Sequence, residues 1–279
     1  MTTLQQIELT CPVCETRFRS QAVVSTNSFG GKRTDFHERA AGTQPLPYLV
    51  HMCSRCGYAG SEKDFTEEAE ITPTLREHVW NELAPKLHQS VLWHQQHGHQ
   101  GAQGGSGAQG GQSSGASLVS NGQGSAQGSG PGSSNAGPSH QTGTTGAVAA
   151  MVTVPGSEKY EAAARVAEWA GAEPRQVADL LLRAAWCCVD EGDVEAERYF
   201  RRRAAWAFEQ ALSAYDGVAR EERAVLTYLV GELWRRVGDW RQARAWFEQV
   251  PHEITETQSQ QWVLDASRQQ KDAPREWFG

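Results

Sequence analysis

The chain has 279 residues and a formal net charge of −7 at pH 7. The strongly basic balance that is typical of nucleic-acid-binding domains is therefore missing. No stretch approaches the roughly 18–20 apolar residues of a membrane span, and the N-terminus lacks the basic and apolar regions of a secretory leader. We therefore expect a cytoplasmic protein with no membrane partner. Its six cysteines are then metal ligands or buried packing groups rather than disulfides.

Composition divides the chain into segments. Residues 98–150 contain no Lys, Arg, Asp or Glu and consist mostly of Gly, Ser, Gln and Ala. Such a segment cannot bury enough apolar surface to offset its conformational entropy, so we predict a disordered tether with a root-mean-square span of roughly 40 Å. The predicted organisation is a zinc ribbon at 1–70, a helical extension at 71–97, a Gly/Ser/Gln-rich linker at 98–156, an α-helical domain at 157–270 and a tail at 271–279.

Two pairs of cysteines have the spacing of metal knuckles, Cys11-Pro-Val-Cys14 and Cys53-Ser-Arg-Cys56. Zinc takes four ligands in a tetrahedron, and thiolates suit it. Two such turns fill the coordination shell and leave no open position, which is typical of a structural site. Short strands are expected at 21–25 and 48–52. The pattern predicts a zinc ribbon that holds one structural Zn²⁺.

Other interpretations of this region are weaker. A redox CxxC would need a thioredoxin-like strand and helix beside it, and none is predicted. His37 and His51 are spare ligand candidates, but with four thiolates present we expect each to be a surface or strand residue. Basic residues around the first knuckle are interspersed with acidic ones, so a mixed solvated surface is expected. These residues are Arg17, Arg19, Lys32, Arg33 and Arg39, with Glu15, Asp35 and Glu38 among them.

The segment after the ribbon has the features of a helix start. Thr72 can cap the helix and Pro73 suits its first position. Apolar residues then recur every four positions, so the helix is expected to extend towards His94. His94, His97 and His99 lie where this helix meets the linker, and we interpret them as incidental polar residues rather than a metal site.

From Ser157 onward the sequence predicts successive amphipathic helices, separated at Gly171, Gly192-Asp193, Asp216-Gly217, Gly238-Asp239 and Pro251. Their predicted spans are 158–171, 174–191, 195–214, 221–237, 240–249 and 255–270. Residues 228–247 match the tetratricopeptide (TPR) pattern. In it, Gly231 lets two helices approach, Gly238 makes the turn, Ala243 packs at the crossing and Phe247 fills the space beside it.

Several residues of the helical part have no assigned chemistry. Trp186, Trp206, Trp234 and Trp246 are expected to fill helix interfaces. The three consecutive arginines at 201–203 point to different sides of one helix, so we expect them to be mostly solvated. Cys187 and Cys188 have no second pair to complete a metal site and are expected to be buried packing residues.

Taken together, the motifs of both halves resemble a bacterial family, domain-of-unknown-function family 2225. The matching elements are Cys11-Pro-Val-Cys14, Pro45-Leu-Pro-Tyr48, Cys53-Ser-Arg-Cys56-Gly-Tyr-Ala59, Ile71-Thr-Pro73 and the segment 228–247. The resemblance implies zinc ligation by the four cysteines and a helical second half, and it implies no activity. The long uncharged segment is a departure from the family pattern, so whether the ribbon packs on the helices stays open.

The expected fold is α+β and multi-domain: a small β zinc ribbon, a long disordered linker and an all-α TPR-like stack. The expected function is non-enzymatic, because no catalytic carboxylate pair, Ser/His/Asp set, phosphate-binding loop or open metal site is evident. TPR-like stacks offer a concave groove for a peptide or helix, so we predict a protein–protein interaction adaptor whose partner the sequence does not identify. The alternative is a nucleic-acid- or transcription-associated zinc-ribbon protein.

Overall fold

The structure is a computed structural model. It describes residues 1–66, 69–97, 148–149, 151, 153–214, 217–255 and 257–278. Most of the predicted linker, including His99, lies outside the described residues. In the described part, no helix is both long and apolar enough to cross a membrane.

The N-terminal part contains two small antiparallel sheets. Strand β1 (Thr3–Thr10) pairs with β2 (Arg17–Ser25), and β3 (His51–Met52) pairs with β4 (Ala59–Gly60). Along β2, Phe18, Ser20 and Ala22 are buried, so alternate side chains face the interior. The strand predicted at 21–25 is therefore the second half of a longer one, and β1 was not predicted.

The strand predicted at 48–52 is shorter than expected. Residues Leu46–Tyr48 form a 3₁₀ turn, and only the two residues of β3 are extended. Proline supplies the reason: Pro45 and Pro47 fix φ near −65° and have no N–H to donate to a sheet.

The helix predicted after the sheets is present as one continuous helix that contains a π-turn. It comprises α1 (Pro73–His78), a π-turn (Val79–Leu83) and α2 (Ala84–His97). The Thr72 side chain accepts a hydrogen bond from Leu75 N at 3.1 Å, which is the expected cap. Pro85 explains the π-turn, because a proline ring clashes with the carbonyl four residues earlier in a regular α-helix.

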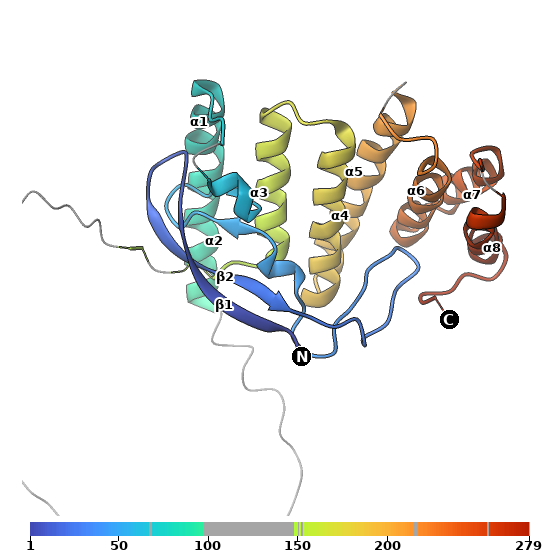
Figure 1. The fold of residues 1–279 in the computed structure, drawn as a ribbon, viewed down its shortest axis with the longest axis horizontal. Coiled ribbons are helices and arrows are strands. Elements are labelled where there is room, and N and C mark those ends of the chain that lie inside the picture. Colours follow the sequence, from blue (N-terminus) through green and yellow to red (C-terminus); the bar gives the residue numbers. More distant parts are fainter. Residues whose placement is uncertain are drawn as a thin grey trace, which may run out of the picture.

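From residue 153 onward, the described residues form six further α-helices. They are α3 (Gly156–Trp169), α4 (Pro174–Glu191), α5 (Val194–Ser213), α6 (Arg223–Val237), α7 (Trp240–Gln249) and α8 (Thr257–Asp272). In Figure 1 consecutive helices lie side by side in chain order. Each lies within a few residues of its predicted span.

The turns between the helices have the predicted chemistry. Gly192 and Gly238 adopt left-handed φ angles of +79° and +95° after α4 and α6. Such angles favour glycine at a helix C-terminus. The next residues, Asp193 and Asp239, then accept hydrogen bonds from Ala196 N and Gln242 N at the starts of α5 and α7.

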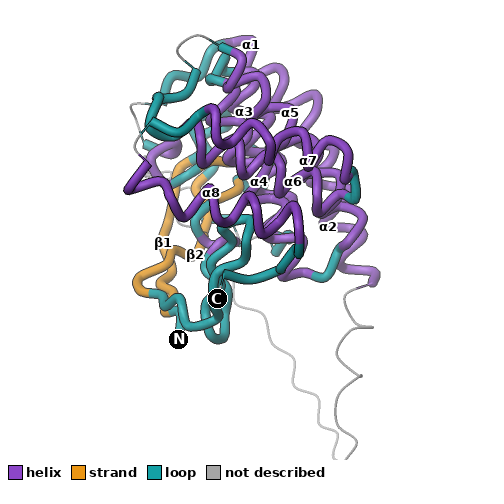
Figure 2. The backbone as a smooth tube through the Cα atoms, turned by 90° about the vertical axis from the view of Figure 1, so that its right-hand side faces the viewer, coloured by secondary structure: helices purple, strands orange, loops and turns teal. Residues whose placement is uncertain are grey.

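The two parts of the chain pack against each other. Tyr160 on α3 donates a hydrogen bond from its hydroxyl to Leu46 O at 3.1 Å, and Lys159 Nζ donates to Pro47 O at 2.9 Å. One cluster of buried residues runs from the cysteines to α8. Figure 2 shows β1 and β2 along one side of the helical layer. The sequence leaves open whether the N-terminal part packs on the helices, and in the structure the two parts share an extensive contact.

The tryptophan prediction holds only in part. Trp234 is buried, and Trp186 and Trp246 are half-buried. Trp206, however, is 54% exposed and meets Trp234 edge to face, so it covers a helix interface from outside rather than filling it. Cys187 and Cys188 are fully buried as predicted, and burial raises the pKa of Cys188 to about 12.

Candidate functional site

The four predicted ligand cysteines come together in one cluster. Their sulfurs all lie within 4.8 Å of one another. Cys11 Sγ and Cys56 Sγ are 3.6 Å apart, and Cys14 Sγ and Cys53 Sγ are 3.5 Å apart. Four thiolates at Zn–S distances of about 2.3 Å in a tetrahedron would have sulfurs about 3.8 Å apart. The cluster therefore has the size of a tetrahedral four-thiolate metal site.

Local backbone geometry builds the two knuckles. In the first, Glu15 N donates to Cys11 O at 2.8 Å, and Glu15 has a φ of +60°. In the second, Gly57 N donates to Cys53 O at 3.0 Å, and Gly57 has a φ of +75°. A Cβ at Gly57 would also lie 3.0 Å from Leu83 O. Glycine is needed there both for the turn and for close packing on the π-turn.

Helix α1 and the π-turn hold the knuckles from outside. Arg76 Nη1 donates to Val13 O within the first knuckle, and Arg76 Nη2 lies 3.5 Å from Pro12 O. The Arg55 guanidinium of the second knuckle lies 5.6 Å from the Trp80 ring centroid. Such outer contacts fix the orientation of metal ligands.

The thiols compete for protons. Hydrogen bonds with Cys14 raise the pKa of Cys11, and hydrogen bonds with Cys11 raise the pKa of Cys56. Hydrogen bonds with Cys11 also lower the pKa values of Cys14 and Cys53. A divalent cation stabilises all four thiolates together and removes this competition.

The two spare histidines take other partners. His51 is buried in β3, where its Nδ1 lies 2.9 Å from Ser20 Oγ. His37 is only 1% exposed, with its Nε2 3.3 Å from Asp190 Oδ2 and its ring stacked on Trp186. His37 is thus neither a surface nor a strand residue. Among the described residues, the candidate metal group consists of the four cysteines alone.

A second polar cluster lies far from the cysteines, where a hairpin contacts the helices. Residues 30–39, called the hairpin below, pair through Arg33 N to His37 O and Arg39 N to Gly31 O, both at 2.9 Å. Its tip is a turn closed by Phe36 N donating to Arg33 O. Phe36 has a φ of +68°, which is unusual for a bulky residue.

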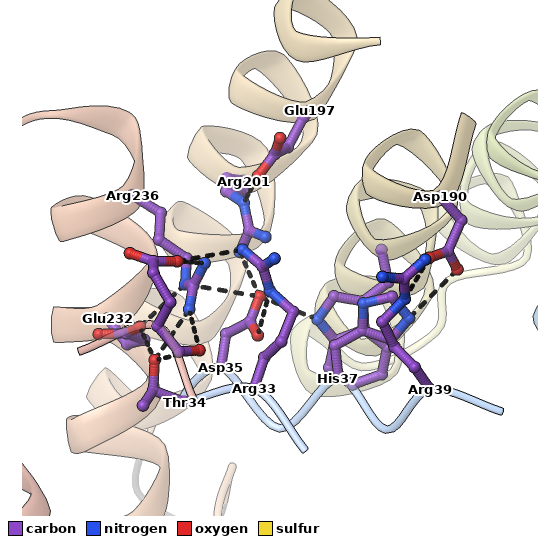
Figure 3. Close-up of polar contacts among 12 residues, drawn as sticks. Arg33, Thr34, Asp35, His37, Arg39, Asp190, Glu197, Arg201, Glu232 and Arg236 are labelled. Atoms are coloured by element: carbon purple, nitrogen blue, oxygen red, sulfur yellow. Dashed lines mark hydrogen bonds and ion pairs between the residues drawn. The ribbon is translucent and has the colours of Figure 1, made fainter. Parts of the chain in front are cut away.

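The tip buries a carboxylate among arginines. Asp35 has no exposed side-chain surface, and its Oδ2 lies 2.7 Å from Arg201 Nη1 on α5 and 3.7 Å from Arg236 Nε on α6. Trp186 Nε1 on α4 donates to the same oxygen at 3.2 Å. Figure 3 shows Asp35 lying between Arg33, Arg201 and Arg236. One side chain of the hairpin thus contacts three helices.

Thr34 fixes the tip to α6 and to the C-terminus. Its hydroxyl donates to Glu232 Oε1 at 2.5 Å and accepts from Arg236 Nη2 at 2.8 Å. Its carbonyl accepts from the Tyr228 hydroxyl at 3.0 Å, and its N–H donates to Glu276 O at 3.1 Å. The C-terminal residues therefore cover the tip on one side.

An ion pair and ring contacts complete the interface between the hairpin and the helices. Arg39 Nε pairs with Asp190 Oδ1 on α4 at 3.0 Å. The Phe36 ring packs near Tyr228, Trp262 and Phe278, with centroid distances of 5.7, 6.0 and 6.0 Å. Burial alone would raise the pKa of Asp35, but the charges of Arg201 and Arg236 outweigh it and hold that pKa below its ordinary range.

These contacts correct two predictions. Arg201 was expected to be mostly solvated and is fully buried, while Arg202 next to it is exposed. Asp35 and Arg33 were expected on a mixed solvated surface; Asp35 is buried and Arg33 is largely covered. A signal was present for Arg201, because it shares the helical spacing of the buried residues Ala204, Ala205 and Phe208. The hairpin had no comparable sequence signal.

A depression of about 440 Å³ lies between α2 and α3, beside the second knuckle. It is lined by Met52, Gly57, Leu83, Leu87, Trp93 and Ala162, with charged side chains around them. The charges pair with one another, as in Lys86 with Glu161, Arg165 with Glu82 and His94 with Glu158. Because these groups are already paired, the depression offers no orphaned charge for a ligand.

Comparison with known protein families gives a match. The model of the family described as an uncharacterized protein conserved in bacteria, DUF2225, matches residues 4–103 and 151–273, which is most of the chain. No curated protein and no solved structure matches the sequence. The family match covers both the cysteine cluster and the helices that receive the hairpin. The chain therefore belongs to the DUF2225 family.

Proposed function

We propose that this protein is a non-enzymatic zinc-binding adaptor that binds a protein partner through a TPR-like helical surface. The observation that carries the proposal is the hairpin itself. Side chains of α4, α5 and α6 contact the carboxylate, the hydroxyl and the aromatic ring at its tip. A helical layer that binds one turn of polypeptide in this way has the chemistry to bind another.

The α6–α7 pair supports the TPR-like part of the proposal. A Cβ at Gly231 on α6 would lie 2.7 Å from the Phe247 ring on α7, so the missing side chain permits the close approach. Ala243 is fully buried at the same crossing. Small residues at these positions are what the TPR pattern requires.

The cysteine cluster has a structural role in this proposal. Four thiolates fill a tetrahedral Zn²⁺ shell and leave no position for substrate, so Cys11, Cys14, Cys53 and Cys56 would hold zinc without catalysing a reaction. The ion would fix the N-terminal part from which the hairpin extends. A cytoplasmic location belongs to the same proposal, because free thiols persist in a reducing compartment.

The alternative, a nucleic-acid-associated zinc ribbon, has less support. Arg17 and Arg19 project from β2 next to Glu8, at 3.1 and 4.0 Å. Arg33 and Arg39 pair with acidic groups of the hairpin contact. Few basic side chains near the ribbon are left for phosphates, which dominate nucleic-acid affinity.

The test is an affinity capture of the tagged full-length protein from its native bacterial cells, with and without nuclease. A Cys11→Ser/Cys14→Ser variant serves as the control for the metal site. The expected result is a discrete protein partner that survives nuclease and is identified by mass spectrometry. Recovery of partners only without nuclease would favour the nucleic-acid alternative, and no specific partner in either condition would contradict the adaptor proposal.

A further inference from the structure

We infer that the helical surface around Arg201 is a receptor site for a protein segment that presents a carboxylate followed by an aromatic residue in a turn, and that the hairpin occupies it as a built-in competitor. We call this surface the receiving face; it comprises Trp186, Asp190, Arg201, Tyr228, Glu232 and Arg236. The inference rests on the proposed adaptor function and names the chemistry of the partner.

The charge of the receiving face requires a carboxylate. Arg201 is fully buried, and without the hairpin Glu197, at 2.8 Å, would be its one acidic partner among the described residues. Arg236 pairs with Glu232 on its own helix, yet it also reaches Asp35. A buried guanidinium without a counter-charge is strongly unfavourable. Any segment that replaced the hairpin would have to supply the negative charge that Asp35 supplies.

The hairpin satisfies this face incompletely. Asp35 meets Arg201 through one oxygen, and Arg201 Nη2 and Asp35 Oδ1 have no hydrogen-bond partner among the described residues. A carboxylate that approached the guanidinium side-on would form two parallel hydrogen bonds, which is the stronger arrangement. A segment that is free to adopt this geometry can therefore bind better than the hairpin does.

Backbone strain in the hairpin also favours its replacement by another segment. Phe36 holds a left-handed φ of +68° that a bulky residue rarely adopts. Ring contacts with Tyr228, Trp262 and Phe278 keep it there. A partner with its aromatic residue in a relaxed conformation would keep the ring contacts without this strain.

The hairpin also has the build of a separable unit. Its neck is exposed at Phe29, Gly30 and Gly31. Gly31, at the start of the hairpin, and Gly42, after its end, have φ angles of +84° and +99°. Glycine provides the backbone freedom that a hinge uses. Because the hairpin belongs to the same chain, it competes at a high effective concentration and weakens the apparent affinity for a partner.

The test uses the full-length protein and a fluorescein-labelled peptide with the sequence of residues 29–41 as the probe. Binding is followed by fluorescence anisotropy for the natural chain and for two releasing variants that leave the receiving face intact. Asp35→Asn removes the competing carboxylate. Gly30→Val disrupts the neck, because a Cβ there would lie 2.7 Å from Arg39 O. Glu38→Gln, on the exposed side of the hairpin, is the matched control.

We expect both releasing variants to bind the probe at least about tenfold more tightly than the natural chain does, with Glu38→Gln unchanged. A probe with Asn in place of Asp35 should bind none of the proteins measurably. Equal binding of both probes, or folded releasing variants that bind no better than the natural chain, would overturn the inference. So would loss of cooperative thermal unfolding in both variants, since the hairpin would then be an obligatory part of the core.

This outcome is separable from that of the adaptor proposal. A partner captured equally by the natural chain and by both releasing variants would leave the adaptor function standing but place its partner elsewhere. Probe binding by the released face without any captured partner would support the receptor chemistry and count against the adaptor function.

Discussion

Asp35 and Arg201 meet at 2.7 Å with no exposed surface on either side chain, although one belongs to the N-terminal hairpin and the other to α5. Burying two charges is costly, and their attraction offsets that cost only while both are present. This buried charge pair therefore acts beside the contacts of Thr34 and Arg39 in holding the hairpin on the helices.

Replacing only one member of this pair should be strongly destabilising. We expect Arg201→Ala to lower the free energy of unfolding by about 3–5 kcal/mol, because Asp35 keeps a buried charge without its main partner. Urea denaturation measures the effect. The neighbouring exposed Arg202→Ala is the control and should change stability by less than about 0.5 kcal/mol. Similar losses for the two variants would show that the Arg201 pair has no special role.

The same carboxylate predicts a pH dependence. The folded-state pKa of Asp35 lies below its ordinary value of 3.8, so its stabilisation is fully present above that value and is lost as the pH falls through the folded pKa. The free energy of unfolding of the natural chain should therefore decrease once the pH is lowered below about 4. The Asp35→Asn variant should be less stable than the natural chain at neutral pH, and its free energy of unfolding should decrease less on acidification. An equally steep loss in the variant would assign the effect to other carboxylates.

The sequence predicts the cysteine cluster but not the Asp35–Arg201 contact, and this difference has a physical reason. Metal knuckles and helix caps are local: Cys11 and Cys14, or Gly238 and Asp239, carry their signal within four residues. The Asp35–Arg201 contact depends on a fold that brings distant segments together, and no local pattern encodes it. Three consecutive arginines point to different sides of one helix, which predicts mostly solvated side chains, yet Arg201 lies on the buried face of α5. Strand β1 was missed because most of its residues are exposed.

Metal removal should act on the N-terminal part. We expect the purified protein to hold about one Zn²⁺ per chain by elemental analysis. Cys11→Ser should lose it and unfold at a lower temperature, because metal binding to such sites is coupled to folding. Cys187→Ala is the control: it removes a buried cysteine that lies outside the cluster, so the zinc content should be unchanged. Zinc retained at full occupancy in Cys11→Ser would contradict the four-ligand assignment.

The close approach of α6 and α7 gives a prediction with a definite sign. In a helix interior, Gly→Ala ordinarily stabilises by up to about 1 kcal/mol. At Gly231 the new Cβ would lie 2.7 Å from the Phe247 ring, so we expect a net loss of about 1–3 kcal/mol in denaturation experiments. Phe247→Leu should lower stability alone but relieve part of the Gly231→Ala loss when combined with it. Additive losses would show that the two positions do not contact.

Arg76 tests whether outer contacts control metal retention. Its guanidinium donates to Val13 O in the first knuckle but contributes no ligand atom. Removing such a partner typically lowers metal affinity by roughly 10–100-fold. The Arg76→Ala variant should therefore lose its zinc to a chelator at a correspondingly lower chelator concentration than the natural chain does. Glu77→Ala, an exposed change on the same turn of α1, should behave as the natural chain does. Because the four thiolates stay in place, Arg76→Ala should still bind one zinc ion when the metal is in excess. Complete loss of zinc, even in excess metal, would mean that Arg76 is needed to fold the knuckle rather than to hold it in position.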